Sequence, residues 1–395
     1  MTVCPICAAA SPAPFLIRDP VPVHQNLLAR TAEAAVALRR GRVALHACGA
    51  CGFVFNAAFD PSLLSYGAAY DNTQSCSPAF SDYVEALADR MVGEGGVRGC
   101  RIVEIGCGKG TFLRALIRRD PSNRGTGFDP SYVGPDSEFD GRLRFARRFF
   151  DASSAGLEAD VIVCRHVIEH VQDPVAMLQL MRRTAGHRPV RLFLETPCVE
   201  WILSNQVTWD FFYEHCSYFS TGSLETALAA AGFAAEVIRH TFGGQYLWAE
   251  ARAGEGALPA SARQTTIPAL ARRFAAHEAS RVDALRRRVE ALAADGPVAM
   301  WGAGAKGVTL ANLIDPERRS IACVLDLNPN KQGGYLPGTG HPIVGPADLL
   351  RWNVHTAVLT NPNYVHENTQ LLREASIDVR LIDLMLPGQV DAHSR

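Results

Sequence analysis

Four cysteines near the start of the chain have the spacing of metal ligands. They form two Cys-x-x-Cys pairs, Cys4 with Cys7 and Cys48 with Cys51. Each pair offers two thiolates from one tight turn, and four thiolates complete the tetrahedral shell of a structural Zn2+, which leaves no position for a catalytic water. We therefore expect structural zinc rather than free thiols. The gap of 40 residues between Cys7 and Cys48 is longer than in a usual zinc ribbon, so we expect an inserted helix such as residues 27–40 to fill it.

A glycine-rich segment lies where a strand pattern gives way to a helical one. It contains Glu104, Gly106, Gly108 and Gly110. Glycines at a strand-to-helix turn let a ligand approach the backbone closely, and an acid at the end of the next strand can bind ribose hydroxyls. Asp129 is that acid, 19 residues after Gly110. This combination favours a ribose-containing cofactor over a purely structural turn.

A carboxylate and an imidazole are adjacent in the polar and aromatic segment 212–220. They belong to Glu214 and His215. Because histidine titrates near neutral pH, His215 is a candidate base for removing a substrate proton, with Glu214 orienting or polarising it. A buried structural histidine with its carboxylate partner explains the spacing equally well.

A second glycine turn occurs late in the chain, as Gly302, Gly304 and Gly307. Asp326 follows Gly307 after 19 residues, and the whole pattern is the dinucleotide fingerprint. Taken alone it predicts NAD, so an NAD-dependent oxidoreductase is the second enzyme class. Two complete cofactor sites in one chain would, however, require a coupled reaction.

The elements that must position these residues alternate between strand and helix. Buried strand patterns cover residues 102–105, 125–128, 161–163 and 191–194, and helical spacing follows them. A second alternation has strand patterns at 298–301, 321–325 and 357–359. Strands alternating with helices predict an α/β fold with two doubly wound units. Helical spacing within residues 254–296 predicts a connector between them.

A polar run at residues 70–78 precedes the first unit. It forms either a lid over the cofactor, with Tyr70 and Gln74 near the reacting group, or an ordinary turn into a helix. We favour the lid, because Ser81 is available as the cap of that helix.

The first glycine turn resembles the first motif of class I S-adenosylmethionine-dependent methyltransferases, in which the turn meets the amino-acid part of the cofactor and the later acid holds the ribose. Residues 160–174 agree, because they are typical of the fourth strand and the following loop in that superfamily. The cofactor-binding residues that this resemblance implies are Glu104, Gly106, Gly108, Gly110, Asp129, Gln74, Arg165 and His166.

The cysteine module, the Glu-His-x-Ser-Tyr-Phe block at 214–219 and the tail block at 302–340 together resemble the three-domain sugar C-methyltransferase family. Its members methylate nucleotide-linked 4-keto deoxysugars at carbon, after a histidine removes the proton beside the keto group. The resemblance implies an N-terminal zinc-binding module, a class I methyltransferase core and a C-terminal Rossmann-like domain without a redox cofactor. O- or N-methylation of a natural-product precursor is the alternative.

The same resemblance assigns residues to the substrate cleft. The catalytic residues that it implies are His215, Glu214, His170 and Tyr70. The substrate-binding residues that it implies are Tyr213, Lys306 and Lys331. The two lysines would pair with substrate phosphates, although solvated surface lysines are the commoner outcome. Where the family has Tyr-His before Glu-His, this chain has Phe212 and Tyr213.

Composition and charge bound the remaining possibilities. The chain has 395 residues, of which 39 are Lys or Arg, 40 are Asp or Glu, and 48% are hydrophobic. This length favours several domains, which we expect at residues 1–80, 81–253, 254–296 and 297–395. The near-zero net charge and the lack of a basic stripe argue against nucleic acid as a partner and against a zinc-module adaptor. No apolar run has membrane length and the first residues do not resemble a signal peptide, so we expect a cytoplasmic monomer or weak dimer that acts on a small molecule.

Overall fold

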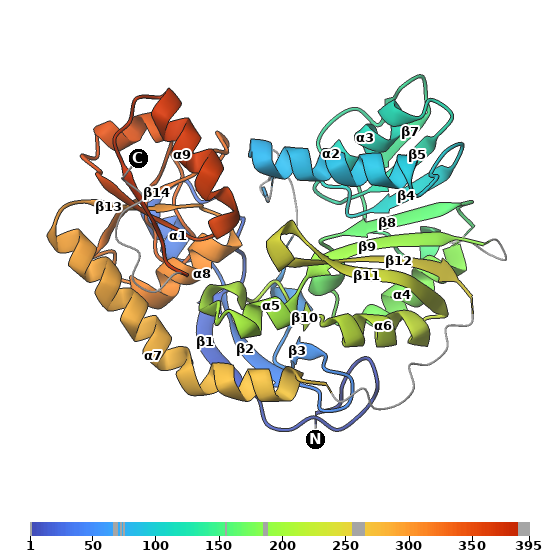
Figure 1. Cartoon of the computed structure of the whole chain (residues 1–395), viewed down its shortest axis with the longest axis horizontal. Coiled ribbons are helices and arrows are strands. Elements are labelled where there is room, and N and C mark those ends of the chain that lie inside the picture. Colours follow the sequence, from blue (N-terminus) through green and yellow to red (C-terminus); the bar gives the residue numbers. More distant parts are fainter. Residues whose placement is uncertain are drawn as a thin grey trace.

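The computed structural model describes residues 2–65, 70, 71, 73, 76–154, 156–184, 189–254 and 265–385. These residues form three β-sheets with helices around them, which confirms the α/β fold class. The middle of the chain and its C-terminal part each build one of the two larger sheets, on opposite sides of Figure 1. In Figure 1 a small N-terminal sheet lies below and between them, and the long helix α7 (Ile267–Ala294) runs from beside this sheet to below the C-terminal part. No helix in the described part of the chain is long and apolar enough to cross a membrane.

The N-terminal sheet is antiparallel, with the strand order β1-β2-β3-β10. Its strands are β1 (Leu16–Pro22), β2 (Arg40–Ala47), β3 (Val54–Asn56) and β10 (Ser217–Tyr218). The last strand comes from far along the chain, so residues near 217 pack with the N-terminal module.

The prediction of a helix at residues 27–40 is wrong. The helix in this segment is α1 (Ala32–Val36), and β2 begins at Arg40. Backbone bridges join Leu27 to Tyr70 and Ala29 to Tyr335. This pairing with distant segments holds the residues before α1 in an extended form, which outweighs their local helical pattern.

The middle sheet has eight strands in the order β11-β12-β9-β8-β4-β5-β7-β6. Its parallel strands are β4 (Arg101–Ile105), β5 (Arg124–Phe128), β7 (Leu143–Ala146), β8 (Val161–Arg165) and β9 (Arg191–Pro197). Its antiparallel strands are β6 (Ser137–Glu138), β11 (Phe233–Thr241) and β12 (Tyr246–Ala253). Helices cover both faces, as predicted for a doubly wound sheet. In Figure 1, α2 (Pro78–Gly93) and α3 (Thr111–Arg119) lie on one side, and α4 (Pro174–Thr184) and α6 (Thr221–Ala230) on the other.

Helix α2 begins earlier than expected. Ser77 caps it by accepting a hydrogen bond from the backbone N–H of Phe80, and Pro78 occupies the first helical position. The prediction that Ser81 is the cap is wrong, because the fixed φ of proline suits the first turn and its missing N–H costs nothing there.

The C-terminal sheet is wholly parallel, with the order β15-β14-β13-β16-β17. Its strands are β13 (Val298–Trp301), β14 (Ile321–Leu325), β15 (Ile343–Val344), β16 (Thr356–Leu359) and β17 (Arg380–Asp383). Helices α8 (Ala305–Ile314) and α9 (Val365–Glu374) accompany it. Helix α7 contributes Phe274 and Leu285 to a hydrophobic core that also holds Leu45 of β2 and Val358 of β16. The N-terminal sheet, α7 and the C-terminal domain are therefore packed as one body.

Candidate active site

The glycine turn after β4 has a backbone that favours glycine. Gly106 and Gly110 have φ values of 68° and 77°, in the left-handed region. A Cβ atom on Gly106 would lie 2.1 Å from Cγ2 of Val167, and one on Gly110 would lie 2.5 Å from the ring of Phe145. A Cβ atom on Gly108 would meet no described atom within 4 Å. A ligand can therefore approach the backbone of the turn at Gly108.

Asp129 follows β5 and lies beside this turn. Its Oδ2 accepts a hydrogen bond of 2.8 Å from the backbone N–H of Gly108. Its Oδ1 accepts bonds of 2.7 Å from the N–H and from the hydroxyl of Ser131. The carboxylate is only partly buried and has about four lone pairs, so one remains for a ligand hydroxyl. The structure thus brings the predicted acid and the predicted turn together.

Glu104 is the buried acid of the turn. Its residue is 3% exposed, and Oε2 has no hydrogen-bond partner within the described part of the protein. Burial raises the pKa of this carboxyl to about 8, against the opposing effect of the Arg165 charge. A buried polar atom without a partner costs about 1–3 kcal/mol, so a ligand group that donates a hydrogen bond here would be stabilised.

A buried ionic network lies at the ends of β8 and β9, next to the turn. Arg165 donates a hydrogen bond of 2.8 Å to Glu195, which also pairs with Nε2 of His166 at 3.2 Å. Glu169 lies 3.5 Å from Nδ1 of the same imidazole. Burial alone would lower the pKa of His166, but the charges of Glu195 and Glu169 outweigh it and raise the pKa to about 9. His166 is therefore a cation at neutral pH.

A cavity of about 290 Å³ lies between the middle sheet and the C-terminal domain. From the middle of the chain it is lined by His166, Glu169, His170, Phe212, Glu214 and His215. From the C-terminal domain it is lined by Gly302, Gly304, Lys306, Asp326 and Lys331, and from the N-terminal segments by Asn26 and Tyr70. Residues 166–170 thus reach from the glycine turn into the cavity. A cofactor at the turn and a substrate in the cavity would meet at this loop.

His170 and His215 face each other in the cavity. Their ring centroids are 4.8 Å apart, with the ring planes at 89°, and the Phe212 ring lies 4.1 Å from that of His215. Burial holds the pKa of His215 well below its ordinary value, and repulsion from a protonated His170 and from the charged His166 lowers it further. Burial also lowers the pKa of His170. Both imidazoles are therefore neutral at pH 7, which is the form that accepts a proton.

Two carboxylates border this histidine pair. Glu214 is 1% exposed, and its Oε2 accepts a hydrogen bond of 2.8 Å from the backbone N–H of Gln25. Glu169 is the second carboxylate, because its ligand atom and those of His170 and His215 lie within 4.8 Å of one another. A divalent cation in the cavity would therefore compete with the proton for these imidazoles.

Tyr213 lies outside the cavity, contrary to the expectation that it contacts the substrate. Its hydroxyl accepts a hydrogen bond of 2.9 Å from the N–H of Asp60 and lies 3.1 Å from the carbonyl of the same residue. Its ring packs on Phe59 at 5.4 Å and fills the space over Gly41, where a Cβ atom would lie 2.4 Å from the ring. Burying the ring while satisfying the hydroxyl explains why the N-terminal core holds this side chain.

The predicted lid is described only in part. Tyr70 lines the cavity, and its hydroxyl lies 3.5 Å from Nδ2 of Asn26. Gln74 falls outside the described residues, so its place near the cofactor stays a prediction.

Both predicted lysines line the cavity. Lys306 forms an ion pair with Asp210. Lys331 is 4% exposed and donates to Oδ1 of Asn26 at 3.0 Å and to the carbonyl of Ala303 at 3.1 Å. Lys331 is therefore not a solvated surface lysine.

The second glycine turn also opens onto the cavity. Asp326 accepts a hydrogen bond of 2.7 Å from the N–H of Ala303 within the turn. A Cβ atom on Gly307 would lie 1.8 Å from the carbonyl oxygen of Gly302, so this position requires glycine.

The four N-terminal cysteine thiols converge. Sγ of Cys4 lies 3.6 Å from that of Cys51, and Sγ of Cys7 lies 3.5 Å from that of Cys48. All four lie within 4.8 Å of one another. A tetrahedral zinc with Zn–S bonds of about 2.3 Å separates its sulfurs by about 3.8 Å, so this donor set fits the metal.

Several cavity residues carry no sequence signal. Asn26 and Asp210 hold the two lysines across separations of 305 and 96 residues, which no local spacing reveals. Tyr246 packs edge-on against His166 with ring centroids 4.6 Å apart. Glu169 is the exception, because it directly precedes His170 in a segment that the sequence already marks.

Two protein-family models match the chain. The model described as a methyltransferase domain matches residues 70–237, and the model described as a C-methyltransferase C-terminal domain matches residues 261–377. The first match includes most of the doubly wound sheet with its glycine turn, and the second includes α7 and most of the C-terminal sheet. The chain therefore contains a methyltransferase domain followed by a region similar to the C-terminal domain of C-methyltransferases.

Among curated proteins, the chain is similar to the C-methyltransferase NovU of Streptomyces niveus, with 30% identity over 207 residues that are 45% of this chain and 47% of that protein. It is also similar to the tRNA U34 carboxymethyltransferase of Campylobacter lari, with 27% identity over 122 residues that are 26% of this chain and 38% of that protein. The matched region spans less than half the length of each relative.

Solved structures of methyltransferases are also similar to part of the chain. The 1,6-didemethyltoxoflavin-N1-methyltransferase of Burkholderia thailandensis has a TM-score of 0.34 and 16% identity, covering 45% of this chain and 81% of its own. The magnesium protoporphyrin IX methyltransferase of Synechocystis has a TM-score of 0.35 and 16% identity, covering 46% of this chain and 87% of its own.

Replacing Asp129 tests the cofactor site. Hydrogen bonds to a charged group contribute about 1.5–3 kcal/mol, so we expect Asp129→Ala to weaken S-adenosylhomocysteine binding about 10- to 150-fold. Calorimetry measures the dissociation constant, and the exposed Asp82→Asn serves as the control. The ligand should raise the melting temperature of the wild type, and NADH should not. An unaltered dissociation constant in Asp129→Ala removes this carboxylate from the site.

The charge of His166 predicts a pH dependence of stability. Its folded pKa of about 9 lies above the ordinary value of 6.5, so its contribution is fully present below pH 6.5 and is lost as the pH rises through 9. At about 1.4 kcal/mol per pKa unit, the loss is on the order of 3 kcal/mol. The difference in unfolding free energy between wild type and His166→Gln, measured by urea unfolding, should shrink over this range. A difference that is constant with pH contradicts the assignment.

Proposed function

We propose that the protein is an S-adenosylmethionine-dependent C-methyltransferase that acts on a nucleotide-linked keto sugar or a related biosynthetic intermediate. The main support is the pair of neutral imidazoles, His170 and His215, in the cavity. The loop after β8 connects this cavity to the glycine turn. A neutral imidazole in a buried site is suited to removing the weakly acidic proton of a carbon beside a keto group. The similarity to the C-methyltransferase NovU supports carbon as the acceptor.

The residues around the first glycine turn fit the proposed cofactor. S-adenosylmethionine, when bound, supplies a methyl group on an activated sulfonium. Glu104 offers a buried Oε2 with no partner in the described residues, which suits a donor such as the ammonium of the amino-acid part. Asp129 would accept hydrogen bonds from the ribose hydroxyls. Gly108 leaves room for both.

His215 would act as the base. Its neutral ring would take the proton from the carbon beside the keto group, and that carbon would then be free to accept the methyl. His170 lies against it and is the second candidate. Most of the rate enhancement would come from holding donor and acceptor in line, because the methyl group is already activated.

The proposed substrate class is supported by the residues that the C-terminal domain contributes to the cavity. Lys331 and Lys306 lie there, close to the start of α8 at Gly304. Cations and a helix N-terminus suit a diphosphate. Both lysines already pair with neighbouring side chains, so a bound diphosphate would replace or share the contacts to Asp210 and Asn26. This arrangement supports a phosphorylated or nucleotide-linked substrate over a purely apolar one.

We also propose that the chain is divided into the four predicted segments and that the protein is cytoplasmic.

We further propose a structural zinc ion bound by Cys4, Cys7, Cys48 and Cys51. A tetrathiolate has no open position, so this zinc would brace the N-terminal sheet rather than take part in the reaction. Gln25 and Asn26 lie in the loop after β1 of that sheet. Gln25 contacts Glu214, and Asn26 contacts Lys331.

Loss of the base tests the proposed mechanism. General-base catalysis contributes about 100- to 10,000-fold, so His215→Gln should lower turnover by that factor while S-adenosylhomocysteine still binds. Transfer of labelled methyl groups to a panel of nucleotide-linked keto sugars measures turnover, and NMR locates the labelled carbon. The exposed His277→Gln is the matched control. The assay buffer contains no added divalent metal, because a cation at Glu169, His170 and His215 would inhibit. Unchanged turnover in His215→Gln rejects this base, and label on oxygen or nitrogen rejects C-methylation.

Metal analysis tests the zinc site. Cys4→Ser combined with Cys7→Ser removes two of the four thiolates, so we expect the bound zinc at this site to be lost and the melting temperature to fall. Cys100→Ser, which changes a thiol outside the cluster, should leave both unchanged. Full zinc occupancy of the N-terminal site in the double variant refutes the tetrathiolate.

A further inference from the structure

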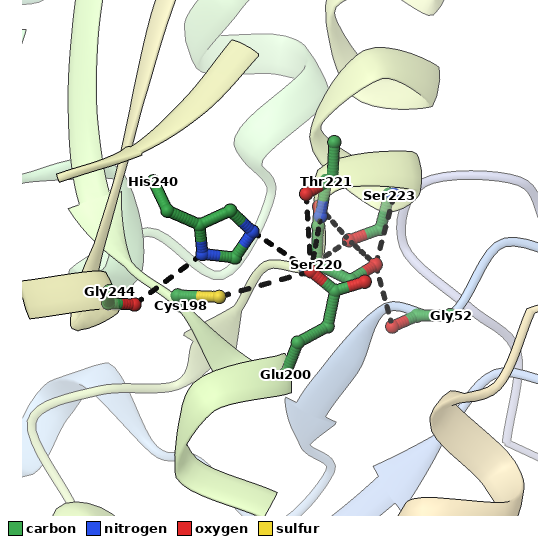
Figure 2. A network of polar contacts seen from close by, with 8 residues as sticks. All are labelled: Gly52, Cys198, Glu200, Ser220, Thr221, Ser223, His240 and Gly244. Carbon is green, nitrogen blue, oxygen red and sulfur yellow. Dashed lines mark hydrogen bonds and ion pairs between the residues drawn. The ribbon is translucent and has the colours of Figure 1, made fainter. Parts of the chain in front are cut away.

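A second group of metal-ligating side chains lies outside the cavity. Cys198 immediately precedes α5 (Val199–Ser204), Glu200 is in the first turn of that helix, and His240 is on β11. Figure 2 shows the His240 ring and the Cys198 sulfur directed at the carboxylate of Glu200. The ligand atoms of all three lie within 4.8 Å of one another.

We propose that Cys198, Glu200 and His240 form a second metal site, which binds a divalent transition metal such as Zn2+. One thiolate, one imidazole and one carboxylate are donors that zinc accepts, whereas Mg2+ and Ca2+ prefer oxygen alone. Three protein ligands leave a fourth position for water. The partial exposure of the Glu200 and His240 side chains, 31% and 48%, leaves that position open to solvent.

The distances fit such a site after a small closure. Oε2 of Glu200 lies 3.9 Å from Sγ of Cys198 and 3.9 Å from Nε2 of His240. Around a tetrahedral zinc, sulfur and oxygen ligands lie about 3.5 Å apart and nitrogen and oxygen about 3.3 Å apart. Binding would require the Glu200 and His240 side chains, both partly exposed, to move by about half an ångström. The position of Cys198 is fixed, because it is fully buried.

Outer contacts orient two of the ligands. Nδ1 of His240 lies 3.5 Å from the carbonyl oxygen of Gly244, so the tautomer with a proton on Nδ1 leaves the lone pair of Nε2 facing Glu200. Oε2 of Glu200 accepts hydrogen bonds from the N–H and the hydroxyl of Thr221, at 3.3 and 3.1 Å, so a metal bound to this oxygen would replace one of them (Figure 2). Such contacts to backbone and hydroxyl groups are the usual support of metal ligands.

The site would act on the wall of the cavity. Pro197 and Gln245 line the cavity. Cys198 is the next residue after Pro197, and Gly244, which contacts His240, directly precedes Gln245. The N–H of Cys198 also donates to the carbonyl of Gln245 at 2.9 Å. A metal ion shared by Cys198 and His240 would therefore fix the two segments of wall relative to each other. This role is separate from the proposed base and from the tetrathiolate zinc.

Metal stoichiometry distinguishes this site from a simple helix cap. The full-length protein carrying His215→Gln, which removes one ligand of the Glu169, His170 and His215 cluster, is equilibrated with Zn2+ at micromolar free concentration and analysed for bound metal, and we expect two zinc ions per chain. His240→Gln and Glu200→Gln should each bind one, and their affinity for the second ion should fall by more than the 10- to 100-fold that loss of an outer-shell partner costs. His277→Gln, a surface histidine on α7, should still bind two.

Cobalt gives a readout that does not depend on counting. The protein with the N-terminal site filled by zinc is titrated with Co2+, and we expect a charge-transfer band of a single cobalt thiolate that disappears in Cys198→Ala and in His240→Gln. One zinc per chain in the His215→Gln protein, or a second ion that persists in both His240→Gln and Glu200→Gln, overturns the proposal. Because His240 is on the surface, its variant folds even if Cys198→Ala does not.

Discussion

The buried guanidinium of Arg18 is the contact on which the geometry of the cavity depends. It donates to the carbonyls of Thr208 and Phe211 at 2.7 and 2.9 Å, and it pairs with Glu278 of α7 at 2.9 Å. One side chain of β1 thereby joins the segment before Glu214 to the long helix. Breaking a buried, paired charge costs about 3–5 kcal/mol, so this junction is rigid. The candidate base, His215, lies four residues after Phe211, so its position depends on a contact that contains no catalytic group.

Histidines in the same region are driven to opposite charge states by their neighbours. His166 has Glu195 and Glu169 within 3.5 Å and is a cation at neutral pH. His215 has the Phe212 ring at 4.1 Å and the charge of His166 nearby, so it is held neutral. Environments that separate the pKa values of neighbouring groups in this way also separate their roles. The cation anchors the loop beside the glycine turn, and the neutral ring is left to accept a proton.

Local patterns in the sequence predicted the repeating parts of the structure. Hydrophobic runs located β4, β5, β8 and β9 of the middle sheet and β13, β14 and β16 of the C-terminal sheet, and glycine spacing located both turns, because each depends on residues close in sequence. The other strands of the two sheets were not predicted. Contacts between distant segments escaped prediction. Leu27 pairs with Tyr70, and Tyr213 bonds to Asp60, so a helix pattern at 27–40 and a family position at 213 were both misleading. The partners of the lysines could not be predicted for the same reason.

The two glycine turns differ in one buried position, and this difference favours different ligands. In each turn, a backbone N–H donates a hydrogen bond to an acid that follows the next strand. This acid is Asp129 in the first turn and Asp326 in the second. The residue two positions before the first glycine is Glu104 in the first turn. In the second turn it is Met300, which is fully buried. Only the first turn therefore has a buried carboxyl that can receive an ammonium group, whereas the second has Lys306 beside it and suits phosphate. The dinucleotide fingerprint is thus better explained as part of the substrate cavity than as a second cofactor site.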